Sequence, residues 1–290
     1  MVNTTLLELL PAPETPPTHL HQAMHYAVMG PGKRLRPLLT LLAANVATDS
    51  PVLPGSHTLR MACVSELVHT ASLILDDLPC MDDATIRRDR PCTHIRFSES
   101  TAILASTNLL NLAYGVIANC PNVDASTKVA VSAHLSHVIG SMGLVGGQVA
   151  DLQNQPMGAR SEIEQLYHQK TGCLFEFSVV TGARLMGQGA EVIEALTRFA
   201  RAFGLVFQLY DDMLDHSIFA LETGKDVQQD AGKTTLLSLY TPEELRGAFS
   251  DAQALAREQL RRAGHAESLL AALVEQQFAT FNGAAQRLGS

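Results

Sequence analysis

Long apolar stretches, separated by short segments rich in polar residues, glycine or proline, follow one another along the 290 residues of the chain. The stretch 59–75 is apolar on nearly all sides, which indicates a central, buried helix. Apolar and helical patterns also predict helices over 18–29, 36–47, 99–118, 125–145, 161–185, 190–214, 242–263 and 266–287. No segment shows sustained alternation of apolar and polar residues, so the signal for strands is negligible. The pattern predicts an all-α protein.

One domain is the simplest organisation, because no linker, low-complexity tract or fixed-period repeat divides the chain. We therefore predict a single helical domain over residues 1–290. Four prolines between Leu10 and Thr18 predict an irregular N-terminal segment, residues 1–17. No uninterrupted apolar run reaches the ~18 residues of a membrane-spanning helix, and no targeting peptide is recognisable. We expect a soluble protein that does not span a membrane.

Composition narrows the possible partners and the compartment. Only 17% of the residues are charged, against about 25% in typical domains, which indicates broad buried surfaces and a subunit interface. The net charge of -8 argues against nucleic acid as a partner. Five cysteines without C-x-x-C spacing indicate reduced thiols in a cytoplasmic protein, and exclude a disulfide framework or a zinc site.

Acidic residues gather where the most apolar stretch ends. Asp76, Asp77, Asp82 and Asp83 lie within eight residues, an arrangement that is costly unless a cation shares the site. Asp76 and Asp82 would lie on different faces of a regular helix. Because Pro79 disfavours a helical Leu78, we expect a break that brings Asp82 back beside Asp76.

A second acidic motif, Asp211-Asp212-Met213-Leu214-Asp215, follows another apolar run. Asp211 and Asp215 are four residues apart and share one face of a helix. Mg²⁺ typically takes one or two carboxylates together with substrate phosphates, whereas a closed zinc site takes Cys or His. Either motif alone is also compatible with a solvated helix end. The two together predict magnesium ions that bridge a diphosphate.

Basic residues lie close to these acids in the sequence. Arginine binds phosphate oxygens in pairs and lysine contributes a compact charge. The residues concerned are Lys33, Arg34 and Arg36 before an apolar helix, Arg87 and Arg88 after the first motif, Lys170 within a helical run, and Lys225 and Lys233 after the second motif. His69 shares a helix stripe with Asp76, and for it a ligand contact and an ordinary core position both stay open.

The combined motifs resemble those of trans-isoprenyl diphosphate synthases of the polyprenyl synthetase family. The matching stretches, which occur in the order of the family, are GKRLRP (32–37), LVHTASLILDDLPCMDD (67–83), RR (87–88), GLVGGQVADL (143–152), KTG (170–172), FGLVFQLYDDMLD (203–215) and TGKDVQQDAGKTT (223–235). The residues within these motifs are most similar to those of bacterial geranylgeranyl diphosphate synthases.

This resemblance implies a helical bundle around a deep central cavity, usually dimeric, that condenses isopentenyl diphosphate with allylic diphosphates. It assigns Mg²⁺ to Asp76, Asp77, Asp82, Asp211 and Asp215. It assigns the allylic diphosphate to Arg87, Lys170, Lys225 and, more weakly, Lys233, and isopentenyl diphosphate to Lys33, Arg36, His69 and Arg88. Thr171 and Gln208, with Lys170, match residues at the reacting carbons. The segment 216–232 would serve as a lid.

Product length should depend on the residues before the first motif. Ala71 and Ser72 are both small, whereas family members that stop at farnesyl diphosphate commonly carry an aromatic residue there. We therefore expect geranylgeranyl diphosphate, with a farnesyl or a longer product as alternatives. Small residues also commonly allow helices to pack closely, so Ala71 and Ser72 could instead serve helix packing.

Three departures from the family pattern concern the site. Asp89 stands where glycine usually follows the arginine pair, Cys92 where threonine is common, and Thr107-Asn108 where Asp-Ala is more usual. Asp89 keeps open a second hypothesis, a regulatory subunit of a heteromeric synthase. A class I terpene cyclase would need a different second metal motif, which the sequence lacks.

Overall fold

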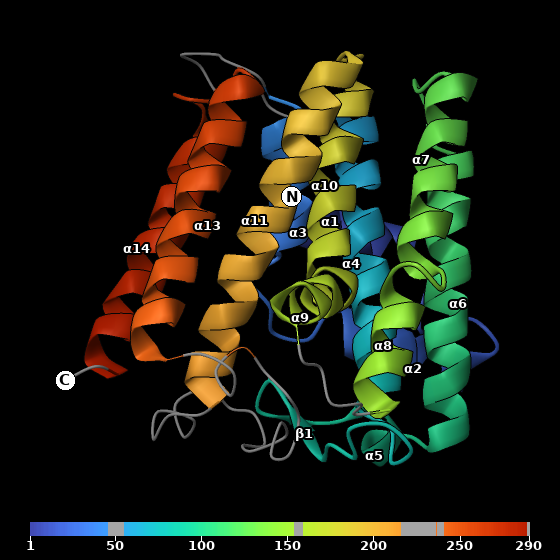
Figure 1. Cartoon of the computed structure of the whole chain (residues 1–290). Helices are drawn as coiled ribbons and strands as arrows, with labels where there is room; N and C mark the ends of the chain where they lie inside the picture. The colour runs from blue at the N-terminus through green and yellow to red at the C-terminus, as the bar shows by residue number, and fades with distance from the viewer. Residues whose placement is uncertain (46–54, 154–158, 216–235, 237–240, 289–290) are drawn as a thin grey trace.

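The computed structural model describes residues 1–45, 55–153, 159–215, 236 and 241–288. Its long helices lie side by side in a bundle (Figure 1). The helices are α1 Val2–Leu9, α2 Thr18–Val28, α3 Leu35–Ala43, α4 Ser56–Asp76, α5 Thr93–Arg96, α6 Glu99–Ala118, α7 Ala125–Ile139, α8 Leu144–Gln153, α9 Arg160–Tyr167, η1 His168–Gly172, α10 Cys173–Leu185, α11 Ala190–Asp215, α13 Pro242–Arg262 and α14 Leu269–Leu288. The all-α prediction is confirmed.

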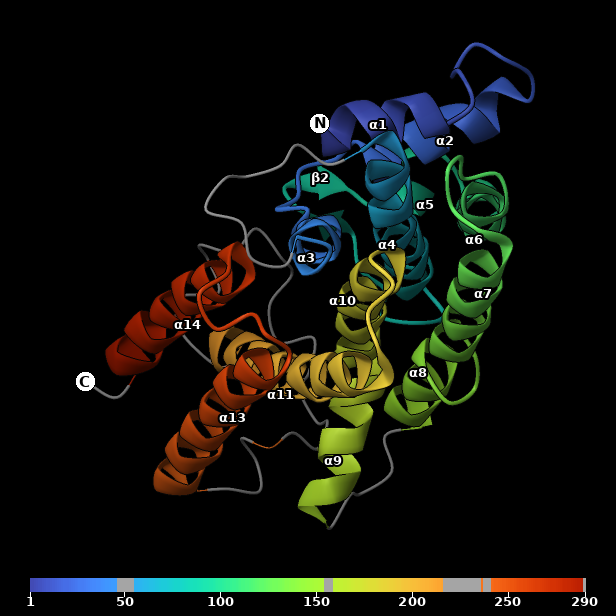
Figure 2. The same ribbon diagram turned by 90° about the horizontal axis from the view of Figure 1, so that it is seen from above.

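Helix α4 occupies the interior of the bundle, as its apolar pattern predicted. It packs against α3, α6 and α10, and seen from above it lies beside α10 with other helices around the pair (Figure 2). Met61, Leu67 and Ala71 are fully buried along it. The acidic motif therefore begins where a core helix leaves the interior.

Helix α10 connects the two hydrophobic cores of the molecule. Leu174 and Phe177 pack in a core with α4 and α6, whereas Phe175 and Val179 pack in a core with α11, α13 and α14. Apolar residues on both sides of α10 leave it little freedom to shift, because each core is close-packed. The residues immediately before α10 are thereby held between the two halves of the bundle.

The prediction of an irregular segment over residues 1–17 is wrong for its first half. Val2–Leu9 forms helix α1, whose Leu6 and Leu9 are buried where α1 packs on α4. Leucine spacing of one turn gives this short segment an apolar face, and tertiary packing then stabilises it despite its length. The proline-rich residues that follow are not helical.

Two of the predicted long helices are interrupted. The helix expected over 125–145 ends at Ile139, and α8 begins at Leu144. A Cβ atom on Gly143 would lie 1.9 Å from the Val138 carbonyl oxygen, so this close turn requires glycine. The helix expected over 161–185 contains a π-helical turn, η1, between α9 and α10.

A two-stranded hairpin was not predicted at all. β1 Ile86–Arg87 pairs in antiparallel fashion with β2 Arg90–Pro91. Each strand has only two residues, too few for an alternating pattern to be detectable in the sequence. The hairpin carries both arginines of the predicted site.

Three helices are long and apolar enough to cross a membrane, by length and composition alone: Ser56–Asp76, Glu99–Ala118 and the helical stretch Ala125–Gln153. The expectation that no stretch has this character was wrong, because it considered only uninterrupted apolar runs. The apolar window of α4 is 72% buried within the protein, whereas those of the other two are 39% and 22% buried. Helices α6, α7 and α8 therefore leave much apolar surface uncovered among the described residues.

Candidate active site

The first acidic motif folds back on itself at the end of α4. The backbone N–H of Asp82 donates to the carbonyl oxygen of Asp76 over 2.9 Å, and that of Asp83 donates to Leu78 over 3.1 Å. The expected break at Pro79 is thus present, and it brings Asp82 next to Asp76. Two carboxyl-bearing residues that are six apart in the sequence now share one site.

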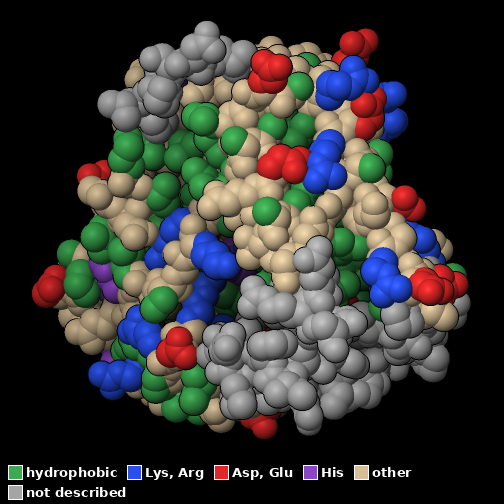
Figure 3. All heavy atoms as spheres, turned by 90° about the vertical axis from the view of Figure 1, so that its left-hand side faces the viewer, with side chains coloured by type: hydrophobic (Ala, Val, Ile, Leu, Met, Phe, Trp, Pro, Cys, Tyr) green, Lys and Arg blue, Asp and Glu red, His purple; other side chains and the backbone are tan. Residues whose placement is uncertain are grey.

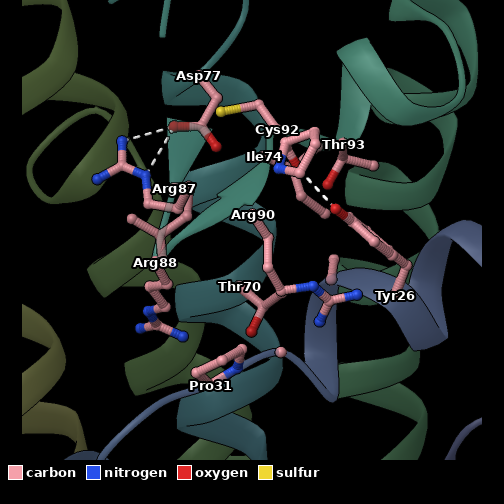
Figure 4. Close-up of a pocket in the computed structure, with 14 residues that line it drawn as sticks. Tyr26, Pro31, Thr70, Ile74, Asp77, Arg87, Arg88, Arg90, Cys92 and Thr93 are labelled. Atoms are coloured by element: carbon pink, nitrogen blue, oxygen red, sulfur yellow. Dashed lines mark hydrogen bonds and ion pairs between the residues drawn. The ribbon is translucent and has the colours of Figure 1, made fainter. Parts of the chain in front are cut away.

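Asp77 is buried and bonded to the hairpin. Arg87 donates to its Oδ1 from Nε over 2.8 Å and from Nη2 over 2.5 Å (Figure 4). Charge-assisted pairs of this kind are among the stronger hydrogen bonds in proteins. Asp77 therefore joins α4 to the hairpin, and its predicted role as a metal ligand stays a prediction.

Asp76 lies in an environment that makes its ionised form less favourable than it would be in water when no cation is present. Burial raises the pKa of its carboxyl group to about 7, and the charges of Asp82 and Asp77 add to this, while Lys170 and Arg87 act in the opposite direction. A divalent cation would reverse this balance, because it stabilises the ionised carboxylate.

The oxygen ligands at this position fit Mg²⁺. The carboxylates of Asp76 and Asp82 are hard oxygen donors, and Mg²⁺ keeps several waters and binds substrate phosphates besides one or two carboxylates. Within the described residues, no three His, Cys, Asp or Glu side chains are arranged to enclose a metal by themselves.

The second acidic motif stays within a continuous helix, α11. Asp212 is buried, and its carboxylate accepts hydrogen bonds from the Tyr167 hydroxyl and, over 2.8 Å, from Nε2 of Gln208. Asp211 is partly exposed, and its charge raises the pKa of Arg36, a minor influence beside burial. The side chain of Asp215 lies outside the described part of the structure.

The π-helical turn η1 presents two of the predicted catalytic residues. Lys170 Nζ lies 2.8 Å from Oδ2 of Asp151 in α8, and the Thr171 hydroxyl donates to Oε1 of Gln208 in α11 over 2.9 Å. Single π-turns inside α-helices often occur at functional sites. The structure thus brings Thr171 and Gln208 into contact and places Lys170 near Asp76, while the role of Thr171 and Gln208 at the reacting carbons stays a prediction.

Arg36, His69 and Arg88 form a second group of predicted ligands. Arg88 Nη2 and His69 Nε2 are 3.4 Å apart, and the guanidinium of Arg36 lies 4.7 Å above the Phe175 ring. Burial, with the charges of Arg36 and Arg88, holds the pKa of His69 well below its usual value. A neutral histidine beside two arginines suits a diphosphate. Figure 3 shows Lys and Arg side chains gathered on one face of this acidic protein.

Arg34 is a residue whose role sequence reasoning missed. It has a left-handed backbone (φ 51) and donates from Nη1 to Glu66 over 2.7 Å and from Nη2 to the Val28 carbonyl over 2.7 Å. The side chains of Arg34 and Glu66 are both largely buried. The signal was present, because Glu66 is a lone acid in an apolar helix and a buried acid needs a partner. This pair fixes the segment that carries Lys33 and Arg36.

Asp151 and Asp212 were also missed as site residues. Asp151 lies within the matched stretch GLVGGQVADL, and Asp212 directly follows a predicted ligand. The sequence does not reveal that the Asp151 carboxylate meets Lys170, whereas the contact of Asp212 with Gln208 follows from helical spacing. Those contacts join segments that are 19 and 4 residues apart, and only the first required the fold.

Asp89 lies at the tip of the hairpin. Arg88 and Asp89 both have positive φ, 54 and 59, and Arg87 pairs with Arg90 across them. A two-residue loop with this geometry is a type I′ turn, which favours glycine at its second position. Aspartate at this position adds backbone strain at an exposed residue, and Arg87 beside the turn still contacts Asp77.

A small cavity of about 50 Å³ lies between α2, α4 and the hairpin. Thr70, Ile74, Asp77, Arg88 and Tyr26 are among the residues around it (Figure 4). Arg90 stacks on Tyr26 at 4.0 Å, and the Tyr26 hydroxyl donates to the Pro91 carbonyl over 2.7 Å. The cavity is too small for a prenyl chain, and these contacts fasten the hairpin to α2.

The structure gives less information about the roles of the remaining predicted residues. Lys33 is exposed. Ser72 lies on the stripe of α4 that carries His69 and Asp76, whereas Ala71 is fully buried and its carbonyl accepts the Ser106 hydroxyl of α6 over 2.8 Å. Their effect on product length stays a prediction. Lys225, Lys233 and the proposed lid, 216–232, lie outside the described residues.

Comparisons with known proteins found similar sequences and a similar fold. The family model described as polyprenyl synthetase matches residues 17–276. A geranylgeranyl diphosphate synthase of Pantoea ananas is 41% identical over 249 residues, 84% of this chain and 80% of that protein. Another, of Pseudescherichia vulneris, is 44% identical over 217 residues, 74% of this chain and 69% of that protein. A crystal structure of a geranyltransferase from Helicobacter pylori, complexed with magnesium and isoprenyl diphosphate, aligns with a TM-score of 0.83 and 26% identity, covering 96% and 94% of the two chains.

Proposed function

The chain belongs to the polyprenyl synthetase family, and from this premise we propose that it is a Mg²⁺-dependent prenyltransferase that condenses isopentenyl diphosphate head-to-tail with allylic diphosphates. Geranylgeranyl diphosphate is the product that the bacterial relatives support. The structural observation that carries the proposal is the folded-back first acidic motif, which places Asp82 beside Asp76 with Lys170 close by. Two further groups accompany it, the second acidic motif and the arginines beside His69.

Each group has a distinct task in this reaction. Asp76, Asp82, Asp211 and Asp215 would hold Mg²⁺, which neutralises charge on the departing pyrophosphate. Lys170 adds a positive charge beside that position. Arg36, His69 and Arg88 would bind the second diphosphate, and the buried Phe175 fixes the plane of Arg36. The two diphosphates are thus held by different residues, so both substrates can be bound at once.

Thr171 and Gln208 would face the reacting carbons. Their hydrogen bond orients the oxygens of both side chains, and oriented dipoles stabilise an allylic cation without reorganisation during the reaction. Gln208 is in turn held by Asp212. This chain of hydrogen bonds, from Thr171 through Gln208 to Asp212 and Tyr167, fixes the polar wall of the site.

Product analysis by mass spectrometry tests the proposal. The purified protein receives isopentenyl diphosphate with dimethylallyl, geranyl or farnesyl diphosphate, with Mg²⁺ or with excess chelator. We expect geranylgeranyl diphosphate only when Mg²⁺ is present. A farnesyl end product would retain the reaction and overturn the product assignment, and no product from any starter would overturn the function.

Product length can be tested at two neighbouring positions. Ala71→Phe and Ser72→Phe each add a large side chain, and the one that lines the path of the growing chain should shorten the product to farnesyl diphosphate. The position of Ser72 on the stripe of α4 that also carries Asp76 favours Ser72 for this role. Unchanged product from both variants, measured by the same assay, would remove these positions from the floor of the cavity.

The assembly and location are proposed on separate grounds. Ile103 and Leu104 on α6, Val129 on α7, and Val145 and Val149 on α8 are exposed, and these helices lie along one side of the molecule (Figure 1). We propose that this apolar face forms a homodimer interface, which sedimentation would detect. All five cysteines are free thiols, which supports a reducing, cytoplasmic location.

A further inference from the structure

The carboxylate of Glu176 is contacted by side chains from three other elements. Glu176 of α10 lies 3.3 Å from Nε2 of His134 in α7, 3.5 Å from Nε2 of His168 in η1, and 3.8 Å from Nε of Arg201 in α11. None of these four residues belongs to the substrate or metal groups described above. The group therefore needs an explanation that the proposed reaction does not yet provide.

Most of this cluster is withdrawn from solvent. The side chains of His134, His168 and Glu176 are 12–15% exposed, whereas Arg201 extends to the surface. Burial raises the pKa of Glu176, but the hydrogen bond from His134 and the nearby His168 and Arg201 outweigh it, so the pKa is lowered. The cluster is thus held together around a charged carboxylate.

Close packing transmits this arrangement to η1. A Cβ atom on Gly172 would lie 2.8 Å from Nδ1 of His168, and one on Gly204 of α11 would lie 2.8 Å from the Gly172 Cα atom. The imidazole of His168 therefore lies directly against Gly172, the last residue of the π-turn, and Gly204 of α11 also packs against Gly172. If the imidazole moves, the π-turn has room to change its backbone.

The same five-residue turn carries the active-site side chains. Lys170 and Thr171 lie between His168 and Gly172 in η1, and they contact Asp151 and Gln208. Because a π-turn has one more residue than the helix around it, its relaxation to regular α-helix would rotate Lys170 and Thr171 away from these partners. Something must hold the turn in place.

We propose that Glu176 is a positioning residue that, by binding His168, holds η1 in the conformation that directs Lys170 and Thr171 at the allylic substrate. The inference rests on the proposed function for the identity of that substrate. It makes His168 the link between the cluster and the site, with His134 and Arg201 fixing the carboxylate of Glu176 from α7 and α11.

The test compares Glu176→Gln with a matched control, Glu194→Gln, whose carboxylate pairs with Arg198 on the exposed surface of α11. For both variants, the Michaelis constants of the allylic and isopentenyl diphosphates, kcat and the melting temperature are measured. Glu176→Gln should raise the KM of the allylic substrate about 10-fold, because small displacements of positioning groups have large effects. The KM of isopentenyl diphosphate should stay within about 2-fold, and the control should match the wild type in all four quantities.

His168→Asn provides a second variant should Glu176→Gln fold poorly, and it should give the same split between the two KM values. Combined with Glu176→Gln it should add little, because both changes remove one interaction. Equal increases of both KM values, or a lower melting temperature with unchanged KM values, would show a purely structural cluster and overturn the proposal.

Hydrogen–deuterium exchange separates this proposal from the proposed function. Backbone amides of residues 168–172 should exchange faster in Glu176→Gln than in the wild type or the control, and unchanged exchange would overturn the positioning role. If the wild type forms no prenyl product, the proposed function fails, while the exchange measurement still decides whether Glu176 holds η1.

Discussion

Both acidic motifs begin with two adjacent aspartates, but the backbone that carries the aspartates differs between them. In the first, the helix ends at Asp76 and the chain turns back, so that Asp82 returns to Asp76. In the second, Asp211 and Asp212 lie within an unbroken helix. Yet in both motifs the second aspartate of the pair is buried and bonded within the protein, Asp77 to Arg87 and Asp212 to Tyr167 and Gln208.

This difference shows what each spacing requires. Asp211 and Asp215 are one turn apart and need only a regular helix to share a face. Asp76 and Asp82 need a break, which Pro79 favours. The common feature suggests a division of tasks within each pair: the first aspartate faces the cations, and the second fixes the motif to its neighbours.

Removing the first aspartate of either pair should have the largest effect. Asp76→Asn and Asp211→Asn should each lower kcat by about 10³-fold, because metal ions contribute several kcal/mol to stabilising a developing charge. Both variants should keep the melting temperature of the wild type within a few degrees. Steady-state kinetics at saturating Mg²⁺ measures the loss, and a decrease below tenfold in either variant would contradict its place among the metal ligands.

Changing the second aspartate should act mainly on folding stability. Asp77→Asn should lower the free energy of unfolding by about 2 kcal/mol, less than for a fully enclosed ion pair because Arg87 keeps part of its side chain in solvent. Asp212→Asn should cost about 1 kcal/mol, since its partners are neutral and one hydrogen bond can persist. Urea unfolding of the metal-free protein compares the two, and a larger loss for Asp212→Asn would reverse the ranking.

The smallest effect is expected at the hairpin that holds Asp77. Asp89→Gly should raise the free energy of unfolding by up to about 1 kcal/mol, because glycine adopts the left-handed backbone of this position without strain. Activity should change little, since the arginines are already in place. A large gain in turnover would instead show that Asp89 damages the site and would revive the regulatory-subunit hypothesis.

Sequence patterns predicted the parts of this molecule that depend on local rules. The core helix 59–75, the break at Pro79 and the helix that runs through Asp211 to Asp215 all follow from apolar spacing or backbone sterics. The resemblance to a family supplied His69, Thr171 and Gln208, and the structure places the latter two in contact. The π-turn η1 was not predictable, because its residues satisfy the helical pattern of their neighbours.

Partners of buried charges were harder to predict, because they come from distant segments. Asp77 was predicted as a metal ligand, a role that stays a prediction, and the sequence did not indicate that a hairpin ten residues later brings Arg87 to it. Arg34 was grouped with phosphate-binding cations, whereas it pairs with Glu66. In each case the residue type indicated that a partner was needed, and only the fold decided which one.

The most direct test of the division within each aspartate pair is the Mg²⁺ affinity of the four single variants, measured by calorimetry with a bound non-reactive allylic thiolodiphosphate. Asp76→Asn and Asp211→Asn should weaken Mg²⁺ binding by about 10-fold or more, because Mg²⁺ relies on few protein carboxylates. Asp77→Asn and Asp212→Asn should bind Mg²⁺ nearly as tightly as the wild type. Equal weakening in all four variants would show that both aspartates of each pair hold the metal, and would contradict the account.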